Sequence, residues 1–114
     1  MTLPNPDRAI VDLAKLRDYC LNPLHPQGKL KARVFAAALG LGREDAGWLR
    51  ARLLEAAHGQ AQLVAVTRFG SLYMIEFELR TRAGAAVIRS GWIVRSGELF
   101  PRLTTCYVKK DRKQ

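Results

Sequence analysis

Residues 85–108, AAVIRSGWIVRSGELFPRLTTCYV, decide the fold, because they contain two apolar strand-like runs joined by a glycine-containing turn. Each run carries an arginine where a fully buried strand would not: Arg89 interrupts the first, and Arg102 opens the second. Side chains alternate between the two faces of a strand, so such an arginine needs an open face. We therefore expect one face of this sheet to meet water or an anionic ligand and to form the functional surface.

The alternating pattern begins earlier, at residue 61, where the apolar residues take up a period of two. Four strands are predicted, at residues 61–69, 72–80, 85–94 and 101–108, separated by the turn signals FGS, TRAG and RSGEL. A four-residue loop at 81–84 places Glu76 opposite Arg89. A loop at 95–100 pairs Ile93 with Arg102, and Gly91 with Thr104.

This register separates apolar from charged side chains, which supports it, because a slip by one residue would exchange the two faces. The predicted apolar face holds Tyr73, Ile75, Phe77, Leu79, Ala86, Ile88, Trp92, Val94, Leu103, Thr105 and Tyr107. The predicted open face holds Glu76, Glu78, Arg89, Gly91, Arg102 and Thr104.

Helical patterns precede the strands, over residues 12–21, 29–39 and 43–58. Asp12 suits the N-cap of the first helix, and Gly40 suits the left-handed position that ends the second. In the second helix we expect the apolar set to be Leu30, Val34, Ala37 and Ala38, with Phe35 and Leu39 beside it. Residues 9–11 suit a short edge strand.

These elements predict an α+β fold, in which about three N-terminal helices pack on one face of a four-stranded antiparallel sheet. With 114 residues the chain is expected to form one domain, from residue 1 to residue 114. Within it, residues 1–8 are predicted to be a loose N-terminal segment, and residues 109–114 a solvated basic tail.

The chain is strongly basic, with a formal charge of +9. Residues 61–114 carry ten basic and four acidic side chains, so this half alone contributes +6. Two interpretations stay open, a solvated basic surface and a polyanion partner such as RNA.

Neither export nor a membrane is indicated, because no signal-peptide pattern and no apolar run of spanning length occurs, and we expect a cytoplasmic protein. Cys20 and Cys106 lack any CxxC or Cys/His spacing. We therefore predict two partly buried thiols, with no metal and no cofactor.

The candidate site residues each have a structural and a functional interpretation. Glu76 and Arg89 form a cross-strand ion pair that is common on solvated sheet faces, but the neighbouring Arg102 and Thr104 favour an anion. Gly91 leaves room for a ligand to approach the backbone. His25 lies in the proline-rich connector and Lys31 in the second helix; each is either structural or directed at the site.

The stretch LNPLHPQGKLKARVF, residues 21–35, resembles the pattern LNPxHPxGxxKAxxF of a family of small uncharacterised bacterial domains. IRSGWI and PRLTTCY, within residues 88–107, are similar to the VRxxWI and PRLxTxY motifs of the same family, with Ile88 for the usual valine. The positions shared with this pattern are His25, Gly28, Lys31, Arg89, Trp92, Arg102 and Thr105, whereas Glu76 is outside it.

Related modules look like the C-terminal toxin domains of contact-dependent inhibition and other polymorphic toxin systems. Their order of helices and strands resembles the barnase/EndoU/colicin/RelE class of metal-independent ribonucleases. The resemblance therefore implies an endoribonuclease-like toxin that cleaves RNA by attack of the 2′-hydroxyl on the adjacent phosphate.

In such an enzyme His25 or Glu76 would act as base, and His25 as acid for the leaving oxygen. Lys31, Arg89 and Arg102 would offset the charge of the phosphorane, and Thr104, or else Thr105, would donate to a phosphate oxygen. The alternative is a non-enzymatic basic RNA-binding module, or one component of a toxin–antitoxin or defence pair with a cognate antitoxin or immunity protein. A purely structural domain is a third interpretation. The sequence indicates no oligomeric state.

Overall fold

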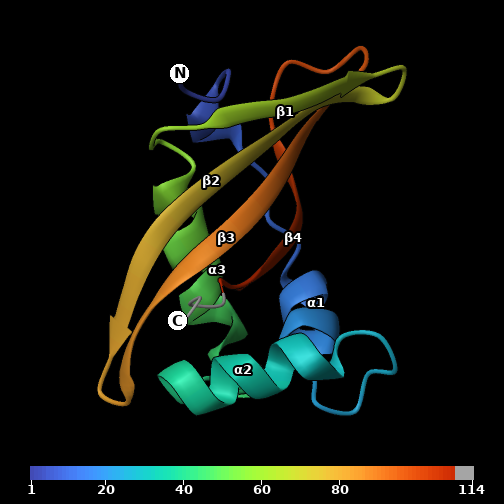
Figure 1. Ribbon diagram of the computed structural model, residues 1–114. Coiled ribbons are helices and arrows are strands. Elements are labelled where there is room, and N and C mark those ends of the chain that lie inside the picture. The colour runs from blue at the N-terminus through green and yellow to red at the C-terminus, as the bar shows by residue number, and fades with distance from the viewer. Residues whose placement is uncertain (110–114) are drawn as a thin grey trace, which may run out of the picture.

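A computed structural model of the chain describes residues 1–109. The helices are α1, Leu13–Lys15, which continues as a π-helical turn over Leu16–Cys20, then α2, Lys29–Leu39, and α3, Ala46–Ala56. Short 3₁₀ turns at Pro6–Arg8 and Arg43–Asp45 precede α1 and α3. The strands are β1, Gln62–Thr67, β2, Gly70–Thr81, β3, Gly84–Arg95, and β4, Arg102–Val108. The predicted α+β class, with helices first and strands last, is confirmed (Figure 1).

The sheet is antiparallel throughout, and its strands lie in chain order. The long hairpin of β2 and β3 has the predicted register, with Glu76 opposite Arg89 and Arg80 opposite Ala85. Arg102 pairs with Ile93, which is also as predicted. The hairpin therefore places the Glu76–Arg89 pair near the middle of the sheet.

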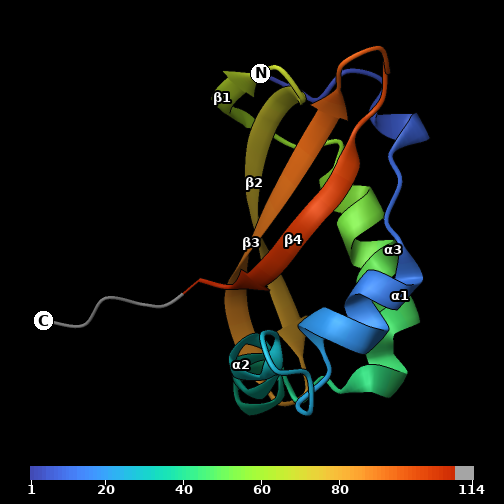
Figure 2. The ribbon, with the colours of Figure 1, turned by 90° about the vertical axis from the view of Figure 1, so that its right-hand side faces the viewer.

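The helices cover one face of the sheet and one of its ends. Figure 2 shows α1 and α3 on the same side of the sheet, whereas α2 lies near the C-terminal end of β4. Contacts of α2 with β3 and β4 agree with this position. The opposite face of the sheet carries no helix, and it is the face that carries Arg89 and Arg102 (Figure 2).

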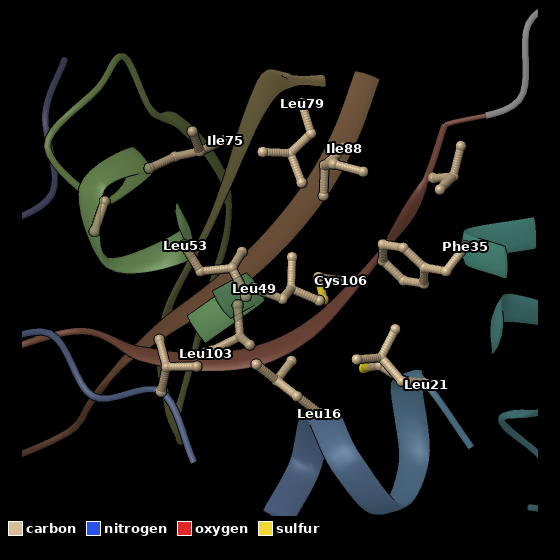
Figure 3. Close-up of a cluster of buried hydrophobic side chains, with 14 of the residues drawn as sticks. Leu16, Leu21, Phe35, Leu49, Leu53, Ile75, Leu79, Ile88, Leu103 and Cys106 are labelled. Atoms are coloured by element: carbon tan, nitrogen blue, oxygen red, sulfur yellow. The ribbon is translucent and has the colours of Figure 1, made fainter. Parts of the chain in front are cut away.

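One apolar cluster fills the space between the helices and the sheet (Figure 3). Trp92, Phe35 and Leu49 are fully buried in it, and Trp92 therefore belongs to the core as predicted. Burying a side chain of this size stabilises the fold by about 1.5–3 kcal/mol. The Trp92 indole N–H donates to the Ser90 hydroxyl at 3.0 Å, so its polar atom is also satisfied.

A β-bulge in β4 corrects one part of the predicted register. Gly91 pairs with Thr105, not with Thr104, although Trp92 still pairs with Leu103. Thr104 is the extra residue, and beyond it the predicted assignment of β4 to the two faces is reversed. Thr105 and Tyr107 therefore lie on the open face, and Cys106 and Val108 fill the core in their place.

The second helix is rotated relative to the prediction. Its buried residues are Ala32, Phe35 and Leu39, whereas Leu30 is 66% exposed. The bounds of the helix are as predicted, and Gly40 has the left-handed conformation expected after it, with φ of 67°. The rotation turns Leu30 and its neighbour Lys31 away from the core and toward the open edge of the sheet.

The N-terminal segment is packed, which contradicts the predicted loose lead-in. Leu3 is buried in the core cluster, and the Ala61 N–H donates to the Met1 carbonyl at 2.7 Å. Ile10 then forms a parallel bridge with Arg102, so residues near it cover the outer edge of β4. Of the predicted basic tail, residues 110–114 lie outside the described residues. Among residues 1–109, no helix is long and apolar enough to span a bilayer.

Candidate functional site

A groove of about 650 Å³ lies where α2 approaches the ends of β3 and β4. We call it the basic groove; it is lined by Leu30, Lys31, Val34, Arg89, Tyr107, Val108 and Lys109. Three of these side chains are cationic and come from α2, from β3 and from the residue that follows β4. Their convergence depends on the rotation of α2 and on the bulge that turns Tyr107 outward.

Glu76 is held by two of these cations. Its carboxylate accepts from Arg89 at 2.8 Å and from Lys109 at 3.3 Å. The hydrogen bond from Arg89, followed by that from Lys109, lowers the pKa of Glu76 below its usual value. The same contact with Glu76, and then the Tyr107 hydroxyl, raise the pKa of Arg89. The ion pair thus keeps Glu76 ionised and available to accept a proton.

Lys31 lies between two tyrosine rings. Its Nζ donates to the Tyr19 hydroxyl at 3.2 Å, and it is 5.3 Å from the centroid of the same ring. The centroid of the Tyr107 ring is 5.9 Å from the ammonium on the groove side. Cation–π contacts at these distances hold a lysine side chain in place while its donors stay directed at the groove.

His25 lies behind the basic groove and does not line it. Its Nδ1 accepts from the backbone N–H groups of Gln27 and Gly28, each at 3.0 Å. The ring stands edge-on to Tyr19, with centroids 4.8 Å apart. His25 is therefore connected to Lys31 through Tyr19, but the structure does not bring its ring to Arg89.

Arg102 lies on the same face as Arg89 but at the other end of it. Its partner Ile93 is four residues from Arg89 along β3, a separation of about 13 Å. Arg102 forms a two-bond ion pair with Glu98, with both contacts at 2.9 Å. Each arginine thus has its own carboxylate, and the two do not meet at one phosphate.

Thr104 and Thr105 border a smaller hollow of about 220 Å³ over Gly91. A Cβ at Gly91 would lie 2.8 Å from the Thr104 Oγ1, which places that hydroxyl against the glycine as predicted. The Oγ1 of Thr105 is buried and has no hydrogen-bond partner among residues 1–109. Both threonines are consequently near the floor of the open face, on the side of Arg89.

Tyr19, Tyr107 and Lys109 were not among the predicted site residues. Tyr107 is part of the PRLTTCY stretch, so a signal was present, but a regular register assigned it to the core. Tyr19 was missed because helical spacing explains it as a core residue. Lys109 was assigned to the basic tail, although its ammonium contacts Glu76.

The two cysteines are free and fully buried, on the π-helical turn and on β4. A hydrogen bond between them lowers the pKa of Cys20 to about 7 and raises that of Cys106. Within residues 1–109 no three His, Cys, Asp or Glu side chains cluster as ligands for a metal ion.

Helices followed by a four-stranded antiparallel sheet with one uncovered face define the architecture of an α+β domain with an open-face site. By sequence, the chain belongs to the family described as a domain of unknown function, DUF6883, which matches residues 2–110. A search of curated proteins found no match.

A similar fold occurs in a solved structure, described as a contact-dependent growth inhibition toxin – immunity protein complex from Klebsiella pneumoniae 342. The TM-score is 0.64, and the match covers 93% of this chain and 97% of the chain in that complex. Only 16% of the aligned residues are identical, so the likeness is one of fold.

Proposed function

We propose that this chain is a metal-independent endoribonuclease-like toxin domain, and that the basic groove is its active site. The observation that carries this proposal is the convergence of Lys31, Arg89 and Lys109 around one groove beside Tyr107. Three cations from separate elements, fixed before substrate arrives, suit the charge that develops on a phosphate during transfer. The groove is open, as a site for a polymer must be.

The proposed reaction forms a bond from the 2′-oxygen of RNA to phosphorus and breaks the bond to the 5′-oxygen. The products are a 2′,3′-cyclic phosphate and a free 5′-hydroxyl. Arg89 and Lys31 offset the charge on the phosphorane oxygens, Glu76 accepts the proton of the 2′-hydroxyl, and Tyr107 donates a proton to the leaving oxygen.

Substrate binding and the basicity of Glu76 are coupled in this scheme. In the free protein Arg89 lowers the pKa of Glu76, which makes the carboxylate a weak base. A phosphate that takes over the Arg89 donors removes this effect, so the pKa of Glu76 rises when the substrate is in place. The ion pair therefore acts as a resting state from which the base is released.

The toxin part of the proposal draws support from the fold. The similar solved chain comes from a toxin–immunity complex, and a net charge of +9 suits an RNA substrate. By the same likeness, we propose a cognate immunity protein as the partner of this chain.

A non-enzymatic RNA-binding module is the second candidate. It is favoured by the ion pairs of Arg89 and Arg102, since each arginine already has a carboxylate partner at 2.9 Å or less. In such a module Arg89→Ala would weaken binding, and no cleavage would accompany it.

Incubation of the purified chain with RNA in EDTA tests the enzyme directly, with the ends of the products analysed. We expect a 2′,3′-cyclic phosphate, and a loss of about 10²-fold or more in rate for Arg89→Ala and Lys31→Ala. Arg33→Ala is the matched control, because it removes an exposed cation from α2 outside the basic groove. RNA that stays intact while bound would overturn the enzyme and leave the binding module.

A further inference from the structure

The open face has a second cation-lined depression, at the end opposite the basic groove. We call it the distal hollow; its volume is about 290 Å³ and its lining is Ile10, Asp12, Lys15, Ile93, Arg95, Arg102, Leu103 and Thr104. Within residues 1–109, Lys15 and Arg95 take part in no ion pair, whereas Arg102 is held by Glu98. Two of the cations are thus available to an incoming anion.

The hollow over Gly91 joins the two ends of the face. It shares Arg89 and Tyr107 with the basic groove, and Thr104 with the distal hollow. The three depressions therefore adjoin one another along β3 and β4. Because the distal hollow is centred near Ile93, about 13 Å from Arg89, a path across all three is longer than a single nucleotide.

The middle of this path suits a nucleobase. Gly91 contributes no side chain to its floor, Leu72 and Met74 contribute apolar atoms, and Tyr107 provides an aromatic ring at one side. Bases stack on such rings without regard to sequence. The unpartnered Oγ1 of Thr105 lies beside the same floor, where a polar group of a ligand can satisfy it after a small movement.

We propose that the open face binds an unpaired RNA strand along this path. One phosphate lies in the basic groove, a base rests over Gly91, and a later phosphate lies between Lys15 and Arg95 in the distal hollow. A base inside a duplex has both of its faces stacked, so it cannot enter the middle hollow. This inference rests on the proposed function, since it specifies the form of the substrate.

The test is a binding measurement with 2′-O-methyl RNA, which lacks the attacking hydroxyl and cannot be cleaved. The probes are an eight-nucleotide single strand and a blunt duplex of the same sequence. We expect the single strand to bind at least tenfold more tightly than the duplex. Lys15→Ala combined with Arg95→Ala should weaken single-strand binding about tenfold and reduce the salt slope by roughly 1.4, the effect of two lost phosphate contacts.

The matched control is Arg33→Ala combined with Arg52→Ala, which removes the same charge from α2 and α3. This pair should change single-strand affinity by less than threefold, because it leaves the path intact. An equal loss for both pairs, or equal binding of strand and duplex, would overturn the path. Since the probe is uncleavable, that result is independent of whether the chain cleaves RNA, and a chain that never cleaves can still show the path.

Discussion

The imidazole of His25 accepts a hydrogen bond from the backbone N–H of Gly28 at 3.0 Å, through the same Nδ1 that accepts from Gln27. This contact fixes the turn that leads into α2, in the way that an Asx side chain fixes a turn. Gly28 in turn lies so close to the Tyr19 backbone that a Cβ on it would be 2.3 Å from the Tyr19 carbonyl oxygen. His25 therefore positions Tyr19 and, through it, Lys31.

His25→Asn should retain most of the activity that His25→Ala loses. An asparagine side chain can accept from the same two N–H groups, but it cannot exchange a proton near neutral pH. We expect His25→Ala to lower kcat at least tenfold and to destabilise the fold by about 0.5–2 kcal/mol, the range for a lost cap. Cleavage rates from pH 5 to pH 9 distinguish the roles: an inactive His25→Asn that is fully folded would make His25 an acid–base group.

Tyr107→Phe should reduce the rate of RNA cleavage by about 10²-fold, because the ring stays and only the proton donor is lost. RNA affinity, measured with an uncleavable strand, should change by less than threefold. Tyr73→Phe is the matched control, since Tyr73 pairs with Trp92 and faces the helices. If both phenylalanine variants cleave at the same rate, Tyr107 is a wall of the groove and has no role in proton transfer.

Acid should destabilise the protein through the ion pairs of the open face. Arg89 lowers the pKa of Glu76, and Arg102 lowers the pKa of Glu98. A carboxylate with a lowered pKa contributes stability above its unfolded pKa, about 4.3 for glutamate, and loses it as the pH falls through the folded value. The midpoint of thermal unfolding should thus decline below about pH 5.

Replacing both glutamates, as Glu76→Gln with Glu98→Gln, should flatten that decline. The comparison is made by circular dichroism at pH 7 and at pH 3, with Glu55→Gln as the control for an exposed helical carboxylate. A double variant whose midpoint falls as steeply as that of the wild type would assign the acid sensitivity to other groups.

Much of the sheet could be predicted from the sequence, because parity and turn length are local. The turn after Arg80 and the alternation around Arg89 fixed the pairing of β2 with β3, and the structure confirms it. The bulge at Thr104 could not be predicted in this way. The doubled threonine has no apolar signal, so a regular ladder and a bulged one fit the same letters equally well.

The site was harder to predict than the fold, because it depends on which side of each element meets another. Lys31 was identified from a motif, but its approach to the groove depends on α2 burying Ala32 and Phe35 rather than Leu30. His25 was chosen for its chemistry, whereas its ring nitrogen is used by the backbone of its own turn. Spacing along the chain does not contain either kind of information.

Deletion of Thr104 should leave the protein folded, because it removes the one residue of β4 that has no partner in the ladder. Without it, Leu103 and Cys106 still face the core, and Thr105 and Tyr107 still face the open side. We expect a cost of roughly 1–2 kcal/mol in the free energy of unfolding, measured in urea, and cleavage within tenfold of the wild type. The contrasting variant is deletion of Ser90 from the regular strand β3, which moves Arg89 toward the core and should prevent folding. If loss of Thr104 unfolds the chain as completely as loss of Ser90, then the bulge itself holds Tyr107 at the groove, and its local twist matters more than the parity of the strand.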